Sequence, residues 1–255
     1  MDLSRARILV CNDDGIHAPG LKVLEKIART LSNDVWVVAP ETEQSASGHS
    51  LTLTLPLRVR KISARRFAIN GTPTDCVLLA VNHILCDQKP DLVLSGVNAG
   101  GNLGEDITYS GTVAAAMEAT LLGIKAISLS QVRRSGKAVR WAPGAENAAG
   151  IVRRLVVTGW PCNVVVNINF PDVAASALTG VAITRQGRCK IGGRLNQGMD
   201  PRGSPYIWIG TERDQDPSLR GSDLEAVHDG KISITQLGLD LSHVPTMMAM
   251  KKVFF

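Results

Sequence analysis

Short apolar segments of strand length alternate with segments of helical periodicity over the first two thirds of this chain. The strand-like segments are rich in Val, Ile and Leu, which is typical of strands buried on both faces of a sheet. They lie at 7–11, 35–39, 91–95, 125–130 and 163–168. The helical patterns lie at 21–28, 73–85, 112–119 and 145–157. This order predicts an α/β fold built on a doubly wound, mostly parallel sheet.

Length and composition narrow the class of protein. The chain has 255 residues, 44% of them hydrophobic and 20% charged, which predicts a single α/β domain over 1–255. No apolar run approaches the roughly 20 residues that cross a bilayer, and the start lacks the layout of a signal peptide. The five cysteines show no CxxC spacing and are expected as free thiols. We therefore expect a cytoplasmic protein without a membrane partner.

The pattern changes after about residue 171. Two short strand-like segments, 206–209 and 231–235, are joined by the polar stretch 211–223. We expect them to form a β-hairpin extension within about 181–240. An extension with few core-facing residues of its own often packs on a partner subunit. A flexible surface loop is the alternative, and the sequence does not separate the two.

Asp13 and Asp14 directly follow the first predicted strand, at the sheet edge where ligand sites form. Two adjacent carboxylates repel each other unless a cation or hydrogen-bond donors compensate, so the pair predicts a divalent metal site. Gly15 follows and favours a turn that lets both side chains reach one site. An aspartyl-phosphate phosphatase would instead place its aspartates at alternate positions of the strand.

Other loops at the same predicted edge carry further oxygen donors. They are the loop 40–50 and the glycine-rich loop 95–104, and their carboxylates, hydroxyls and amide oxygens suit Mg²⁺ or Mn²⁺. The run 109–112 precedes an alanine-rich helix, where backbone N–H groups and two hydroxyls can bind a phosphate. The simpler alternative is that Ser110 or Thr112 only caps the helix.

Five segments, in order, resemble the SurE family of metal-dependent 5′/3′-nucleotidases. They cover about the first half of the chain, and two later segments, 167–171 and 184–186, match more loosely. The five segments lie at 8–16, 38–50, 71–77, 90–104 and 109–113.

The resemblance implies a Rossmann-like core and one divalent metal ion per subunit, Mg²⁺ or Mn²⁺. It implies that the metal is bound by Asp13, Asp14, Ser45 and Asn98. It also implies that the C-terminal hairpin serves assembly into a homodimer or homotetramer. These motifs say least about substrate preference: the base, the 5′ or 3′ position, and any cleavage of short polyphosphate.

From this resemblance and the loops we predict a phosphoric monoester hydrolase, a 5′-nucleotidase that releases phosphate from nucleoside 5′- and 3′-monophosphates. Ser110, Gly111 and Thr112, with Asn98, are the predicted phosphate-binding residues. The metal would polarise a phosphate oxygen and lower the pKa of a bound water.

Proton transfer in this reaction is specified less clearly. Asn12 is predicted to orient the attacking water or to bind phosphate, and with Asp13 and Asp14 it completes the predicted catalytic set. Either aspartate, or hydroxide already formed on the metal, would serve as the base. His49 is a candidate general acid, although an ordinary hydrogen-bonded loop histidine is the favoured interpretation.

Two other classes of function fit parts of the sequence. One is a module that binds nucleotide and metal without turnover. The other is a nucleic-acid-binding protein, suggested by a net charge of +5 and by the basic segments 58–61 and 65–66. Only 4% of the residues are aromatic, which leaves little for base stacking and makes nucleic acid the less favoured partner.

Overall fold

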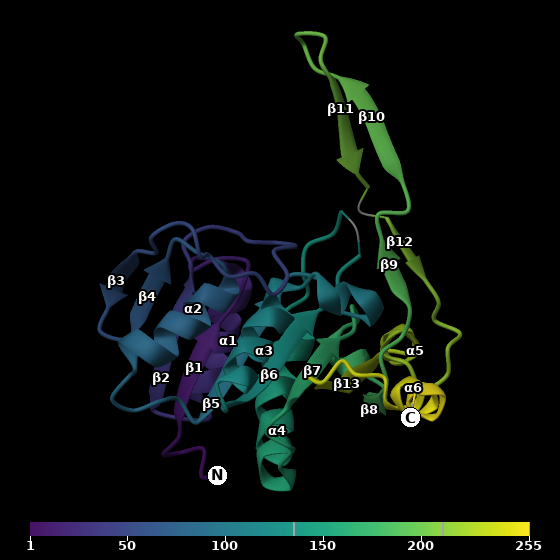
Figure 1. Ribbon diagram of the computed structural model, residues 1–255. Helices are drawn as coiled ribbons and strands as arrows, with labels where there is room; N and C mark the ends of the chain where they lie inside the picture. Colours follow the sequence, from purple (N-terminus) through teal and green to yellow (C-terminus); the bar gives the residue numbers. More distant parts are fainter. Residues whose placement is uncertain (135, 211, 255) are drawn as a thin grey trace.

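The computed structural model describes residues 1–134, 136–210 and 212–254. Its centre is a nine-stranded sheet with the order β3-β4-β2-β1-β5-β6-β7-β13-β8 (Figure 1). These strands are β1 (Arg7–Cys11), β2 (Asp34–Pro40), β3 (Val59–Ser63), β4 (Arg66–Ile69), β5 (Leu92–Asn98), β6 (Lys125–Gln131), β7 (Val164–Phe170), β8 (Gly180–Thr184) and β13 (Lys231–Gly238). Neighbouring strands are parallel except at β3–β4 and β7–β13.

Helices cover both faces of this sheet, which confirms the predicted α/β, doubly wound fold. The helices are α1 (Pro19–Arg29), α2 (Pro73–Leu79), α3 (Gly111–Leu121), α4 (Ala142–Thr158), α5 (Asp223–His228) and α6 (Val244–Phe254), with a π turn at Ala80–Ile84 and 3₁₀ turns at Gly104–Thr108 and Ala175–Ala177. α1 and α4 pack over one hydrophobic cluster, and α2 and α3 pack over the other. Adjacent residues of β5 show the division, because Leu94 lies in the first cluster and Val93 in the second.

Local sequence signals explain where the helices begin. α2 begins with a capping box, in which the Thr72 hydroxyl accepts from the Asp75 backbone N–H at 3.1 Å and the Asp75 carboxylate accepts from the Thr72 N–H at 2.9 Å. α1 begins at Pro19, whose missing N–H is no loss in a first turn. A Cβ on Gly20 would lie only 1.9 Å from the Val97 carbonyl oxygen, so this glycine lets α1 pack directly on β5.

The predicted pairing of the C-terminal strands is wrong. The segment 206–209 lies in β11, whose partner is β10, and the two form an antiparallel hairpin. The segment 231–235 belongs to β13, which joins the central sheet between β7 and β8. The physical reason is burial, since Ile232 and Ile234 find core partners there. The additional strands are β9 (Cys189–Ile191), β10 (Leu195–Met199), β11 (Pro205–Ile209) and β12 (Arg213–Gln215).

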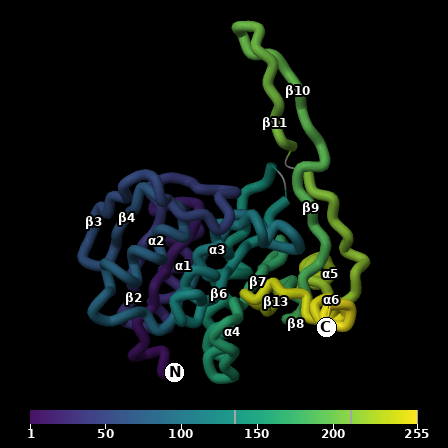
Figure 2. Tube along the Cα trace, in the orientation of Figure 1, coloured from purple at the N-terminus to yellow at the C-terminus, as the bar shows by residue number. Residues whose placement is uncertain are grey.

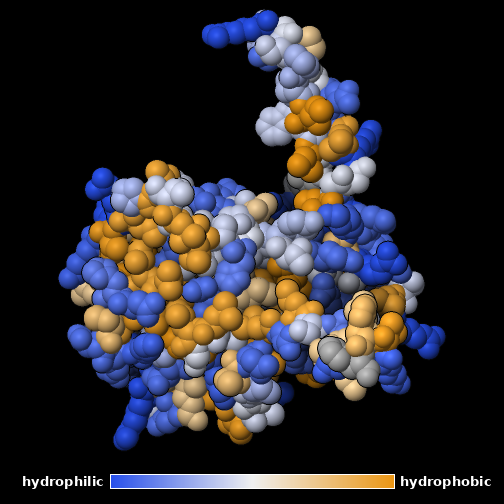
Figure 3. All heavy atoms as spheres, in the orientation of Figure 1, coloured by the Kyte–Doolittle hydropathy of each residue, from blue (hydrophilic) through white to orange (hydrophobic). Residues whose placement is uncertain are grey.

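The β10–β11 hairpin, here called the arm, extends away from the body of the molecule (Figure 2). It stands on the small β9–β12 pair at its base. All residues of β11 are exposed, and apolar side chains cluster along the arm in the space-filling view (Figure 3). α6 likewise has no buried residue. Within the described residues, no helix has the length and apolar character needed to cross a membrane.

Candidate active site

The three predicted loops meet because of the strand order. β1 lies between β2 and β5, so the segments that follow these strands leave the sheet side by side. Gly15, with φ of +99°, turns the chain directly after the aspartates. The Gln44 N–H donates to the Asp13 carbonyl oxygen at 2.8 Å, and the Ala99 N–H donates to Asp14 Oδ2 at 3.2 Å. Backbone hydrogen bonds thus connect the first loop to each of the other two.

Asp13 is packed against the start of α3. It is 4% exposed, and the Thr112 hydroxyl donates a short hydrogen bond to Asp13 Oδ1. A Cβ on Gly111 would lie 2.8 Å from the Asp13 Cβ, so only glycine allows this approach. Ser110 caps α3 by accepting from the Val113 N–H at 3.1 Å, which is the simpler role considered for it.

Burial works against ionisation of both aspartates. It is the main cause that raises the pKa of Asp13, and the hydrogen bonds from Thr112 oppose it. The pKa of Asp14 rises to about 6, chiefly through burial and then through the charge of Asp13. Glu43 raises the pKa of both carboxyls further, while Arg133 lowers that of Asp14. The pair is therefore a site of excess negative charge that a cation would relieve.

The other two predicted metal ligands lie in the adjoining loops. Asn98 is the last residue of β5, and its side-chain Nδ2 donates to the Gly100 carbonyl oxygen at 3.0 Å. The side-chain oxygen Oδ1 is therefore the atom left to bind a cation. Ser45 is exposed and donates to Glu43 Oε1 at 2.7 Å. No group of three or more His, Cys, Asp or Glu residues is arranged for a metal among the described residues. A metal here would therefore depend on two carboxylates and neutral oxygens, a donor set that suits Mg²⁺ or Mn²⁺.

Asn12 offers an acceptor without a partner. Its side chain is fully buried, and Nδ2 donates to the Gly15 carbonyl at 3.0 Å, which fixes the orientation of the amide. Oδ1 is buried and has no hydrogen-bond partner. Buried acceptors are nearly always satisfied, so this atom marks a place for a donor such as a water molecule.

His49 contacts α3 rather than the aspartates. Its Nε2 lies 3.0 Å from Glu118 Oε2, and the Glu118 side chain is only 10% exposed. Of the two interpretations of this residue, the contact favours an ordinary hydrogen-bonded histidine over a general acid.

Glu43 and Arg133 were missed as site residues by reasoning from sequence. Glu43 lies in the predicted loop 40–50 but was not singled out. Arg133 lies in the segment after β6. Because loops that follow parallel strands share one edge of the sheet, its position in the sequence indicates that it can reach the site. Their influence on the aspartates is electrostatic, and it appears only when the loops are placed in space.

A buried network holds the far end of the glycine-rich loop. The Asn102 N–H donates to Asn169 Oδ1 at 2.8 Å, and its carbonyl accepts from Asn167 and Asn169 at 2.9 and 3.0 Å. Two residues on, the Gly104 carbonyl accepts from Gln186 Nε2 at 3.0 Å. The loosely matching segments 167–171 and 184–186 therefore fix the loop that carries Asn98.

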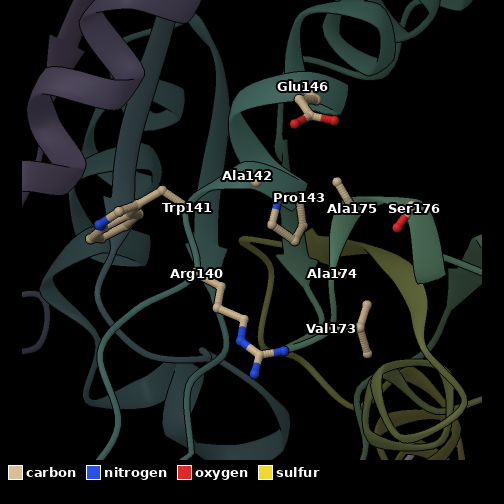
Figure 4. A pocket seen from close by; sticks show the side chains of 9 residues that line it. All are labelled: Arg140, Trp141, Ala142, Pro143, Glu146, Val173, Ala174, Ala175 and Ser176. Atoms are coloured by element: carbon tan, nitrogen blue, oxygen red, sulfur yellow. The ribbon is translucent and has the colours of Figure 1, made fainter.

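A separate pocket of about 510 Å³ lies at the start of α4 (Figure 4). Its polar lining residues are Arg140, Glu146 and Ser176, and none of the predicted site residues contributes to it. Arg140 and Arg134 form ion pairs with Asp172, at 3.6 and 3.8 Å. The candidate active site is thus the open sheet edge above the aspartates and not this pocket.

Replacing Thr112 with Val should destabilise the metal-free protein in a pH-dependent way. The variant leaves the buried Asp13 carboxylate without its hydroxyl donor, at a cost of about 1–3 kcal/mol near pH 7.5. Burial already raises the pKa of Asp13, and losing the donor raises it further, so the stability deficit of the variant shrinks as pH falls from 7.5 to 4.5 and the carboxyl takes up protons. Urea unfolding in EDTA at both pH values measures this difference.

Thr120→Val is the matched control for that measurement. Thr120 is buried on the same helix and donates to the Ala116 carbonyl at 2.9 Å, with no ionisable partner. The Thr120→Val variant should lose the same free energy of unfolding, relative to the wild type, at both pH values. An equal pH response in the two variants would contradict the assigned role of Thr112.

Comparisons with known proteins identify the family of this chain. The family model described as survival protein SurE matches residues 8–192. A protein of Paramagnetospirillum magneticum named 5′-nucleotidase SurE is 60% identical over 99% of this chain and 97% of its own. One of Rhodospirillum rubrum with the same name is 53% identical, with 99% and 98% covered. The crystal structure of the SurE protein from Aquifex aeolicus superposes with a TM-score of 0.84 at 39% identity, covering 98% of this chain and all of that one. The chain belongs to the SurE family.

Proposed function

We propose that the protein is a metal-dependent 5′-nucleotidase, which hydrolyses nucleoside 5′-monophosphates to nucleoside and phosphate. The names of its relatives support the reaction class. The observation that carries the proposal is the pair of aspartates after β1, with Asp13 buried against the start of α3, Asp14 half-buried, and both pKa values raised chiefly by burial. A phosphate at this edge would meet a helix start and a cation-binding pair together.

Asp13, Asp14, Ser45 and Asn98 are the proposed ligands of one Mg²⁺ or Mn²⁺ ion per subunit. Their donor atoms are all oxygens, and the raised pKa of Asp14, caused chiefly by burial and then by the charge of Asp13, supports a cation at this place. When bound, such an ion polarises a phosphate oxygen and lowers the pKa of a water molecule.

The chain's own residues divide the remaining work. Asn12 Oδ1, the orphaned acceptor, accepts a hydrogen bond from the attacking water and orients it. Gly111 and Thr112, at the start of α3, bind the phosphate, and Ser110 stabilises this end of the helix as its N-cap. The positive charge of Arg133 offsets negative charge near Asp14. Hydrolysis of 3′-monophosphates and of short polyphosphate, and a cytoplasmic location, stay predictions of the sequence.

The nucleic-acid alternative loses part of its support. Three of the basic residues that suggested it are paired with acidic side chains: Arg60 with Glu41 at 2.8 Å, and Arg66 with Glu25 at 2.6 Å. Arg65 pairs with Asp34 at 3.2 Å. A binding module without turnover is the other alternative, and an activity assay separates it.

Asp14→Asn should lower phosphate release at least 100-fold, because it removes a charge from the cation site but hardly changes side-chain volume. The assay follows phosphate released from a panel of nucleoside 5′- and 3′-monophosphates, with Mn²⁺ or with EDTA. Asp91→Asn is the control, since Asp91 lies at the opposite end of β5 and accepts from the Arg7 N–H. Undiminished activity of the wild-type protein in EDTA, or full activity of Asp14→Asn, would refute the metal assignment.

The arm is proposed to assemble the protein into a homodimer or homotetramer. Its exposed apolar side chains would be an aggregation risk in a monomer and suit an interface between copies. They are Leu195, Met199, Tyr206, Ile207, Trp208 and Ile209.

Charge introduced on the arm should break this assembly. Ile207→Glu is expected to shift the protein to a smaller species in size-exclusion chromatography with light scattering. Arg202→Glu changes charge at the exposed turn between β10 and β11 without removing apolar surface, so it should leave the mass unchanged. A monomeric wild-type protein would overturn the proposal.

A further inference from the structure

Tyr109 presents an exposed aromatic ring beside the candidate active site. The residue is 42% exposed, although Ser110 next to it is buried. It comes directly before the residue that caps α3. Tyr109 therefore directly precedes the proposed phosphate-binding segment 110–112.

The backbone of Tyr109 is fixed from two directions. Its N–H donates to the Asp106 carbonyl at 3.0 Å, and its own carbonyl accepts from the Gly48 N–H at 3.1 Å. Gly48 belongs to the loop that also carries Ser45. The backbone that carries the ring thus has a defined position relative to both the loop 40–50 and the start of α3.

Lys190 holds the side chain of Tyr109. Its Nζ donates to the Tyr109 hydroxyl at 2.6 Å and lies 4.7 Å from the ring centroid. Lys190 is itself placed by β9, which contacts the 3₁₀ turn at Gly104–Thr108 and pairs with β12 (Figure 1). Two elements far apart in sequence therefore keep an exposed ring in one orientation, which lowers the ordering cost of a partner that stacks on it.

The other exposed aromatic side chains lie elsewhere. Among the described residues they are Tyr206 and Trp208 on the arm and Phe254 on α6. A single ring at the site suits one nucleobase, whereas proteins that bind nucleic-acid strands stack successive bases on several rings.

We propose that Tyr109 stacks on the base of the nucleotide and that Lys190 is a positioning residue for its ring. The proposal rests on the proposed function, because the phosphate of the same substrate must lie at the start of α3. It assigns the preference for nucleoside monophosphates over other phosphomonoesters to this ring.

The test compares two substrates that differ only in the base, adenosine 5′-monophosphate and ribose 5-phosphate. In Tyr109→Ala, the ratio of their kcat/KM values should fall about tenfold through the KM for the nucleotide, the size expected for one stacked base. Tyr109→Phe keeps the ring and should recover most of the ratio. Lys190→Met should lower the ratio less than Tyr109→Ala does. Phe254→Ala removes an exposed aromatic ring from α6, to which no role in binding or assembly is assigned, and should leave the ratio unchanged.

Two results would overturn the proposal. One is an equal loss on both substrates in Tyr109→Ala, which would mean that the residue only shapes the loop. The other is a wild-type enzyme with no preference between the substrates. If the wild type hydrolyses neither, the proposed function fails separately, and equilibrium binding of the two compounds to the same variants still decides the role of the ring.

Discussion

Two adjacent carboxylates at the end of β1 repel each other, and the surrounding loops are arranged to compensate for this repulsion. Asp13 is buried and Asp14 partly so, and the negative charge of Asp13 adds to burial in raising the pKa of Asp14. The protein compensates in part with the Thr112 hydroxyl, the Ala99 N–H and the charge of Arg133. These groups do not restore an ordinary pKa, so the remaining demand is for a cation.

The sheet provides the rigid frame for these carboxylates. With β1 in the middle, the loops after β2 and β5 reach the aspartates from both sides. The far end of the glycine-rich loop is fixed by Asn167 and Asn169, polar side chains that are fully buried in β7. Polar residues in a core strand are costly unless their hydrogen bonds are satisfied, and here they are satisfied by the loop. Fold and site are thus parts of one hydrogen-bonded structure.

Local patterns in the sequence were enough to predict the α/β fold, most helices and strands, and the meeting of three loops around Asp13 and Asp14. The pairing of β13 was not predictable in this way, because alternating Ile232 and Ile234 indicate a strand but not its neighbour. Glu43 and Arg133 act through space, and Lys190 reaches Tyr109 across 81 positions of sequence. Contacts of this kind depend on how loops from distant strands are placed, which no short motif encodes.

Calorimetric titration of the metal-free protein with Mn²⁺ at pH 8 and pH 5 measures whether Asp13 and Asp14 form a cation site. One ion should bind per subunit at pH 8, where Asp14, with a pKa of about 6, is already ionised. At pH 5, a unit below the pKa of about 6 for Asp14, protons compete for the site and affinity should fall by about tenfold or more. Absence of binding at pH 8, or equal affinity at both pH values, would contradict a cation site built on Asp13 and Asp14.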